Sequence, residues 1–492
     1  MKRTLYAILG FLCFNFSTTY AQTWAKSLGS TSIDQAKSMT VDVGGNSYVA
    51  GFFSGTIPLG NSTVISSGGQ RDIFLARYGS DGTLLWAKGI GGPGDDEAKD
   101  VAVDLSGNIY IIGEFVGLVD FDPSVGIAIK SSVAASDVFI AKFDAAGNFV
   151  WVESIEGQGA DLGYSIEVGA NSDIYVSGFF NGNLNFSTSL TTDDLTLTEN
   201  SAIFLAKYTS AGSFVWSKKI ESSENIVVKD MTIDGADNFY CTGTYKANTD
   251  FDPDPNTVKT LSLSGNTDAF LAKYSNTGAL LWARSIHGIN IEESETVEIA
   301  PDGNILIGGH FLNSIDLDPS NSNNFITSIG QRDAFIANYT PAGGFRWGKS
   351  FGGTGNEYGY SLDTDNQGRI FMTGTFQGTI DINPDPNVAA NLTSSAGSDI
   401  YIVKLDSIGN YLWGTSAGGS NGDLAESIAV NTNEEVYLSG WFQGSALLGN
   451  TTLNSAGDRD IFIAKISLAT ISNTYQFDNK IHVKVSPNPF HS

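Results

Sequence analysis

Four short segments within residues 84–142 decide the fold: Leu84-Leu-Trp-Ala-Lys88, Asp100-Val-Ala-Val-Asp104, Ile109-Tyr-Ile-Ile112 and Asp137-Val-Phe-Ile-Ala-Lys142. Each segment is four to six residues long and rich in β-branched or aromatic residues, which is typical of β-strands. Gly and Asn separate the segments, as in Ser106-Gly-Asn108, and no stretch shows sustained helical periodicity. This part of the chain therefore predicts four strands and no helix.

The same pattern recurs along the whole chain. Trp is found at positions 24, 86, 151, 216, 282, 347 and 413, at spacings of 62 to 66 residues. A Gly follows with the same spacings at 51, 113, 178, 243, 309, 374 and 440, and an aromatic residue stands three positions before it in six of the seven copies. An Asp begins another segment at 72, 137, 268, 333, 399 and 460, whereas the third copy has Ala202. Several residue types that repeat in one phase indicate a repeat architecture with seven copies.

Four strands in each of seven copies predict an all-β fold, a seven-bladed β-propeller with four-stranded blades. A solenoid is the alternative, although solenoid repeats are usually much shorter. Tight turns join the Val-rich segment to the Tyr segment and the Asp segment to the Trp segment, so both pairs are expected to be hairpins. The predicted order in a blade is Val-rich, Tyr, Asp and Trp strand, with the Trp strand outermost.

Closure of the ring is predicted from the two ends of the repeat. The last Asp strand, residues 460–466, has no Trp strand after it, and the first Trp strand lies at residues 22–29. These two segments are expected to pair, which would hide strand edges that otherwise promote aggregation. The same strand order places both tight turns on one face of the disc and the long connections on the other, which is the face expected to carry function.

Three of these motifs resemble a known repeat, the seven-bladed β-propeller repeat called SBBP. They are Trp347-Gly-Lys-Ser-Phe-Gly-Gly353, the Asp104-x-x-Gly-Asn-x-Tyr110 turn and Asp399-Ile-Tyr-Ile-Val-Lys404. The resemblance covers about residues 22–468 in seven in-phase copies. It implies a secreted propeller and no common reaction.

The N-terminus has the features of an export signal. Lys2 and Arg3 precede an apolar run over residues 5–16, which is too short for a typical membrane span, and Thr19-Tyr-Ala21 is a small-x-small cleavage site. These features predict a signal peptide over residues 1–21 and a mature chain that begins at Gln22. We expect a secreted or cell-surface protein, with no membrane span after signal cleavage.

The C-terminus resembles a second export signal. Val483-Lys-Val-Ser-Pro-Asn-Pro-Phe490 is similar to the opening strand of the sorting domain used by type IX secretion. The most recognisable positions of this sorting motif are Pro487, Asn488, Pro489 and Phe490. The resemblance implies that the secretion machinery binds the C-terminal segment, followed by release or attachment at the cell surface. Such domains continue for several more strands, so residues 469–492 are interpreted as a linker and the truncated start of a sorting domain.

Acidic loops between the Tyr and Asp strands are candidate calcium sites. Asp250-Phe-Asp-Pro-Asp-Pro-Asn256 and Asp381-Ile-Asn-Pro-Asp-Pro-Asn387 place oxygen-bearing side chains at every second position. The predicted ligands are Asp250, Asp252, Asp254, Asn256, Asp381, Asn383, Asp385 and Asn387. Calcium takes six to eight oxygen ligands, although Asp and Asn also bond to their own backbone in turns, and Pro stiffens such turns. Calcium is the one cofactor that the sequence suggests.

The amino-acid composition limits the classes of partner that the protein can bind. Lys and Arg number 27 against 53 Asp and Glu, a net charge of −26, and this charge repels phosphate backbones, so nucleic acid is excluded as a partner. Cys241 is the single Cys outside the signal peptide, so no disulfide within the mature chain is possible.

The function predicted from the sequence is that of a non-catalytic binding or structural module at the cell surface, with a glycan or protein ligand. His287 and His310 show no catalytic or metal-ligand spacing, and the Arg residues are scattered along the chain rather than clustered. Trp441 is out of phase with the other Trp residues and is a candidate for ligand contact. Two alternatives stay open: a polysaccharide-degrading enzyme with its site on the long-loop face, and a fragment of a larger adhesin.

Overall fold

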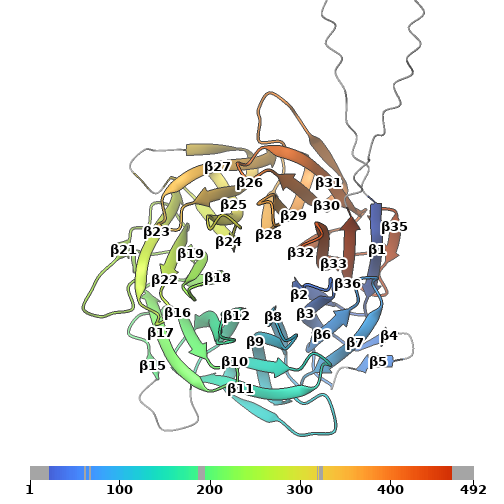
Figure 1. Ribbon diagram of the computed structural model, residues 1–492, viewed down its shortest axis with the longest axis vertical. Coiled ribbons are helices and arrows are strands. Elements are labelled where there is room, and N and C mark those ends of the chain that lie inside the picture. The colour runs from blue at the N-terminus through green and yellow to red at the C-terminus, as the bar shows by residue number, and fades with distance from the viewer. Residues whose placement is uncertain are drawn as a thin grey trace, which may run out of the picture.

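The computed structural model describes residues 21–59, 62–65, 68–186, 194–318, 320 and 325–467. All regular elements in these ranges are β-strands, and they form a propeller-like ring around a central channel (Figure 1). Within the same ranges, no helix has the length and apolar character that a membrane crossing requires. The predicted all-β, propeller-like fold is therefore confirmed.

The strands pair antiparallel in groups of four, and each group takes the name of the strand next to the channel. From the channel outward, the first three are the β2 group of β2 (Gln35–Val41), β3 (Ser47–Phe53), β6 (Asp72–Tyr78) and β7 (Leu84–Ile90), the β8 group of β8 (Glu97–Val103), β9 (Ile109–Asp120), β10 (Ile129–Phe143) and β11 (Phe149–Gly157), and the β12 group of β12 (Leu162–Val168), β13 (Ile174–Phe180), β16 (Ser201–Tyr208) and β17 (Phe214–Ser222).

The remaining groups continue around the ring in chain order. They are the β18 group of β18 (Ile226–Ile233), β19 (Phe239–Tyr245), β22 (Asp268–Tyr274) and β23 (Leu280–Gly288), the β24 group of β24 (Ile291–Ile299), β25 (Ile305–Asp316), β26 (Phe325–Tyr339) and β27 (Phe345–Gly353), the β28 group of β28 (Glu357–Thr364), β29 (Ile370–Asp381), β30 (Asn391–Leu405) and β31 (Tyr411–Gly419), and the β32 group of β32 (Asp423–Val430), β33 (Glu435–Phe442), β36 (Asp460–Ser467) and β1 (Ala21–Leu28). In every group the pairing follows the predicted order of Val-rich, Tyr, Asp and Trp strand.

Short hairpins project from the connections between the Tyr and Asp strands. They are β4 (Thr56–Leu59) with β5 (Ser62–Ile65), β14 (Asn183–Asn185) with β15 (Leu195–Thr196), β20 (Thr249–Asp250) with β21 (Thr260–Leu261), and β34 (Ser445–Leu448) with β35 (Thr451–Asn454). In the β8, β24 and β28 groups the two main strands themselves lengthen into this arm. Several arms pair with the outer strand of the preceding group, for example β14 with β11 and β25 with β23.

A β-bulge in each inner strand explains the recurring Gly of the Tyr strand. In β8 the register with β9 shifts between Ala98 and Asp100. The carbonyl oxygen of Glu97 then lies 1.9 Å from where a Cβ on Gly113 would stand. Because no side chain can occupy that space, the position requires Gly in each copy.

Most of the recurring Trp side chains pack against a turn of the next group. The indole Nε1 of Trp24 donates to the carbonyl of Ser80 at 3.2 Å, and that of Trp151 donates to Ser210 at the same distance. Both carbonyls belong to the tight turn between the two outer strands of the next group. The turn contains a Gly with positive φ, and at Gly212 a Cβ would stand 3.0 Å from the Trp151 ring. The Trp and the turn Gly therefore recur together because they are packed against each other.

The hydrophobic cores lie between neighbouring groups rather than inside one sheet. The recurring Tyr residues are buried in these cores, as shown by Tyr48 between the β2 and β8 groups and Tyr110 between the β8 and β12 groups. Packing between sheets thus supplies the stability that a chain without disulfides needs.

The strand β1 lies beside β36 although the two are at opposite ends of the described chain (Figure 1). The antiparallel register pairs Ala25 with Ala464 and Leu28 with Ile461. Trp24 joins a buried cluster shared by the β32 and β2 groups.

Candidate binding site on the long-loop face

Tight turns and long connections lie at opposite ends of the strands, as predicted. The turn after β8 is closed by the Gly107 N–H, which donates to the Asp104 carbonyl at 2.9 Å, and the turn after β10 is closed in the same way by Gly147 and Asp144 at 2.8 Å. The opposite ends of these strands lead into the connections between groups and into the projecting arms. We call this second surface the long-loop face.

The acidic loop over residues 250–256 folds its side chains back onto its own backbone. Oδ1 of Asp250 accepts N–H bonds from Asp252 at 3.1 Å and from Lys259 at 2.7 Å. Asp252 and Asp254 repeat the pattern two residues further on, at 3.1 and 2.9 Å. The backbone and side-chain N–H groups of Asn256 lower the pKa of Asp254. The loop is a succession of turns in which each carboxylate accepts the N–H two residues later.

The loop over residues 381–387 has the same construction. Asp381 Oδ1 accepts from Asn383 at 3.0 Å and from Ala390 at 2.9 Å, and Asn383 and Asp385 continue the series at 3.0 Å each. Among the described residues, neither loop brings three Asp, Glu, His or Cys ligand atoms within 4.8 Å of one another. Calcium binding through the Asp and Asn side chains of these loops stays a prediction.

A cavity of about 660 Å³ opens on the long-loop face beside the channel, where the β32, β2 and β8 groups meet. Two Arg side chains line it, and each stacks on an aromatic ring. The Arg71 guanidinium carbon lies 5.0 Å from the Phe52 ring centroid, and that of Arg459 lies 4.1 Å from the Trp441 centroid. Both stacks are of the cation–π type.

The charged side chains around the cavity differ in whether they form ion pairs. Arg71 contacts Asp95 at 3.2 Å and Glu97 at 3.1 Å, and Lys99 contacts Glu97 at 2.9 Å. By contrast, within the part of the chain that the structure describes, Arg459 has no ion-pair partner, and its guanidinium contact is the Trp441 ring. The N–H donors at the edge of this guanidinium are therefore available to a ligand.

The central channel contains a set of carboxylates on inner strands. They include Asp100, Glu167, Asp230, Glu298 and Asp363. Burial raises the pKa of Asp230 and of Asp363 to about 7, and burial together with the neighbouring carboxylates raises that of Glu167 and Glu298 well above the ordinary value.

Some of these carboxylates connect one group to the next. Asp100 Oδ2 accepts the backbone N–H of Ile166 in the β12 group at 2.8 Å, and Asp230 Oδ2 accepts that of Val297 in the β24 group at 2.8 Å. These bonds satisfy backbone donors on the inner strand edges. The channel acids therefore have a structural role around the ring.

Comparison with known proteins agrees with this arrangement. The model of a β-propeller repeat family, SBBP, matches residues 85–114, from β7 through β8 into β9. The chain is a β-propeller repeat protein.

Relatives of the propeller in sequence include an uncharacterized WD repeat-containing protein of Acanthamoeba polyphaga mimivirus, 25% identical over 87% of this chain and 36% of the relative. The regulatory protein FlaEY of Caulobacter vibrioides is 23% identical over 34% of this chain and 18% of that protein. The chain therefore spans about a third of the first relative and less than a fifth of the second.

Among solved structures, the propeller is similar to quinohemoprotein alcohol dehydrogenase from Comamonas testosteroni, with a TM-score of 0.40, 9% identity, and coverage of 91% of this chain and 76% of that one. Puromycin hydrolase has a TM-score of 0.39 and 11% identity, with 87% of this chain and 54% of that one covered. Similarity at such TM-scores carries no argument about function.

The sequence alone did not point to the two Arg residues of the cavity. Arg71 and Arg459 are 388 positions apart, and only the ring brings them to one cavity. A signal was nevertheless present, because each directly precedes a recurring Asp, Asp72 or Asp460. Trp441, the predicted candidate for ligand contact, supports the Arg459 guanidinium beside this cavity.

Proposed function

We propose that the propeller is a secreted or cell-surface, non-catalytic binding module with seven blades closed into a ring by β1. The pairing of β1 with β36 and the buried cluster around Trp24 support the closure. The four-strand groups, each with one recurring Trp, support the number of blades.

Export is part of the same proposal. The signal peptide over residues 1–21 and the type IX sorting motif at Pro487, Asn488, Pro489 and Phe490 support it. Residues 1–20 and the sorting motif lie outside the described residues. The boundaries of the propeller at residues 22 and 468 likewise rest on the sequence repeat.

The observation that carries the binding function is the unpaired guanidinium of Arg459 in the cavity on the long-loop face. Stacking on Trp441 holds the guanidinium plane in one orientation and leaves its planar fork of donors free. This fork matches a carboxylate, which it can bind through two parallel hydrogen bonds. The ligand class that fits is therefore a carboxylate-bearing one.

The rest of the lining favours a glycan as the carrier of that carboxylate. Gln35, Ser54 and Gln70 add polar side chains to the cavity wall, and such groups can bind the hydroxyls of a sugar. The lining also contains four Lys or Arg side chains against two acidic ones, so the cavity is locally positive on a strongly acidic chain. We assign an acidic glycan with uronate residues as the ligand.

The paired state of the cavity carboxylates supports binding over catalysis. Asp95 and Glu97 both contact Arg71. Both carboxylates are thus engaged by a guanidinium, whereas glycoside hydrolysis needs a pair of carboxyl groups that flank the glycosidic bond.

The test is equilibrium binding of digalacturonate to the full chain and to the Arg459→Gln variant. We expect the variant to bind on the order of tenfold or more weakly, because a hydrogen bond to a charged group contributes roughly 1.5–3 kcal/mol. The matched control is Arg346→Gln, since Arg346 pairs with Asp302 outside the cavity. Equal binding by all three proteins, or binding of neutral digalactose with the same affinity, would overturn the assignment. Release of new reducing ends would support the polysaccharide-degrading alternative.

A further inference from the structure

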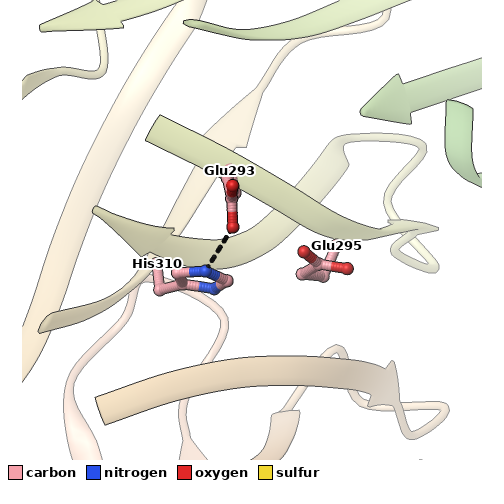
Figure 2. Close-up of side chains that lie close together, drawn as sticks. All are labelled: Glu293, Glu295 and His310. Carbon is pink, nitrogen blue, oxygen red and sulfur yellow. Dashed lines mark hydrogen bonds and ion pairs between the residues drawn. The ribbon is translucent and has the colours of Figure 1, made fainter. Parts of the chain in front are cut away.

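Glu293, Glu295 and His310 lie together on two neighbouring strands (Figure 2). The two Glu residues belong to β24 and His310 belongs to β25, where the register pairs Glu293 directly with His310. Glu295 has no partner in this register, because it is the extra residue of the bulge between Ser294 and Thr296. One ligand atom from each of the three side chains lies within 4.8 Å of the other two.

The His310 side chain is fixed in place and has an unused ring nitrogen. It is only 2% exposed, and its Nε2 lies 2.7 Å from Glu293 Oε2. The Tyr358 ring packs against the imidazole edge to face, with 4.7 Å between centroids. Among the described residues, the buried Nδ1 has no hydrogen-bond partner. Buried nitrogens normally have one, so this atom indicates a missing partner.

The equivalent place in the β8 group already contains a cation. Glu97 and Glu114 face each other across β8 and β9, and Lys99 Nζ lies 2.9 Å from the first and 3.3 Å from the second. In the β24 group, Glu295 stands at the position of that lysine. The β24 group thus has a third ligand where the β8 group has an ammonium ion.

Two positive side chains approach the cluster from outside. Lys229 Nζ of β18 lies 3.1 Å from Glu295 Oε2, and Arg332 Nη1 of β26 lies 3.4 Å from Glu293 Oε2. The side chains of Lys229 and Arg332 are 32% and 23% exposed. Ion pairs at partly exposed positions contribute little to stability, and both side chains are long enough to turn into solvent. They can therefore be displaced by a stronger cation.

We propose that Glu293, Glu295 and His310 bind a divalent transition-metal ion such as Zn²⁺. Carboxylate oxygens and an imidazole nitrogen are ligands that Zn²⁺ accepts, and three protein ligands leave a position for water or a ligand. Glu295 also lines the central channel, which provides a path for the ion. The metal site is independent of the proposed glycan cavity.

The test is calorimetric titration of the tag-free full chain with Zn²⁺ in excess Ca²⁺, which saturates oxygen-only sites. We expect one saturable site that the Glu295→Lys variant loses, because this change copies Lys99 and installs a competing ammonium ion. The Arg332→Gln variant is expected to bind Zn²⁺ several-fold more tightly, because it removes a competing cation. Co²⁺ titration gives a second readout through its visible absorption.

The matched control is Glu97→Gln, which changes the equivalent carboxylate of the β8 group and should leave Zn²⁺ binding unchanged. His482 and His491 of the C-terminal segment are present in every variant, so the differences between variants isolate the β24 cluster. Equal Zn²⁺ binding by wild type and Glu295→Lys would overturn the proposal. So would an Arg332→Gln variant that is less stable and binds no metal more tightly, since the cluster would then be an internal ion-pair network.

Discussion

At the residue scale, the same residue recurs at a position of the repeat because it makes the same direct contact in the fold. Gly113 recurs because a carbonyl oxygen occupies the space of its Cβ, and Trp151 recurs because its ring covers a turn Gly. The Asp residues of the acidic loops are different, because their contacts are local. Asp250 bonds to N–H groups two and nine residues away, so the same side chains can serve a turn, a cation or both.

The first prediction separates those two roles in the loop over residues 250–256. Asp250→Ala removes the acceptor of two backbone N–H groups and should lower the free energy of unfolding by about 1–2 kcal/mol in EDTA. A triple replacement of Asp250, Asp252 and Asp254 by Asn keeps each Oδ1 acceptor and removes the charges. If the loop binds calcium, millimolar Ca²⁺ should raise the Tm of the wild-type chain and not that of the triple variant. An equal response of both proteins to Ca²⁺ would exclude this loop as the metal site.

At the element scale, the connections between groups bury acidic side chains in pairs. Asp137 and Asp161 illustrate this: Asp137 Oδ1 accepts the Gly157 N–H at 3.0 Å, and Asp161 Oδ1 accepts the Asn181 N–H at 3.2 Å. Asp161 Oδ2 is buried without a partner among the described residues. Burial, with a contribution from Asp137, raises the pKa of Asp161 to about 7.

An equivalent acidic pair is found at five further connections between groups, and one connection lacks it. The equivalent positions are Asp72 with Asp96, Asp268 with Glu292, Asp333 with Glu357, Asp399 with Asp423, and Asp460 with Asp34. At the connection from the β12 to the β18 group both acids are missing, and Ala202 and Ile226 replace them. Two acids lost together indicate that the two positions act as a unit.

The second prediction concerns the pH dependence of this pair. Asp161 has a raised pKa, so between about pH 4 and pH 7 the folded chain holds a proton that the unfolded chain has released. Stability must therefore fall as pH rises through that window, by up to about 4 kcal/mol. The double variant Asp137→Ala with Asp161→Ile, which copies residues 202 and 226, should lose this part of the slope. Urea unfolding at pH 5, 6, 7 and 8 measures it.

The comparison of variant with wild type isolates the pair from other acids. Groups with a lowered pKa, such as Glu293 at about 2, stabilise the folded chain less as the pH falls. This contribution has the opposite sign to that of Asp161 and is the same in both proteins. An unchanged slope in the double variant would show that Asp137 and Asp161 are both ionised in the folded chain at neutral pH.

At the scale of the whole molecule, one long-range pairing joins β1 to β36. The strand β1 contributes Trp24 to the cluster between the β32 and β2 groups and covers the edge of β36. Without it, the donors and acceptors of β36 would be exposed, and an exposed strand edge is a template for pairing with another chain.

The third prediction is that removal of residues 22–28 from the mature chain causes loss of the monomer. We expect a lower Tm and higher-order species in size-exclusion chromatography, whereas a chain that begins at Gln22 should be monomeric. A separate peptide of residues 22–29 should restore the monomer by occupying the free edge. A deletion variant that is monomeric and equally stable would contradict closure by β1.

The sequence by itself determined what depends on period and on near neighbours. The lengths of the connections between recurring segments predicted the strand order and the face that carries the long connections, because a tight turn pairs the two strands that it joins. The turns at residues 250–256 could also be predicted from the sequence, because each of these hydrogen bonds joins residues that are close in the chain.

Only the tertiary structure decided which distant residues share a site. Arg71 and Arg459 line one cavity because the two ends of the described chain meet, and the predicted pairing of those ends did not say which side chains would share a cavity. Glu293 and His310 face each other because of strand register, and a bulge adds Glu295. The raised pKa of Asp161 likewise needs burial, which the folded ring creates by excluding water from side chains that the sequence alone would leave solvated.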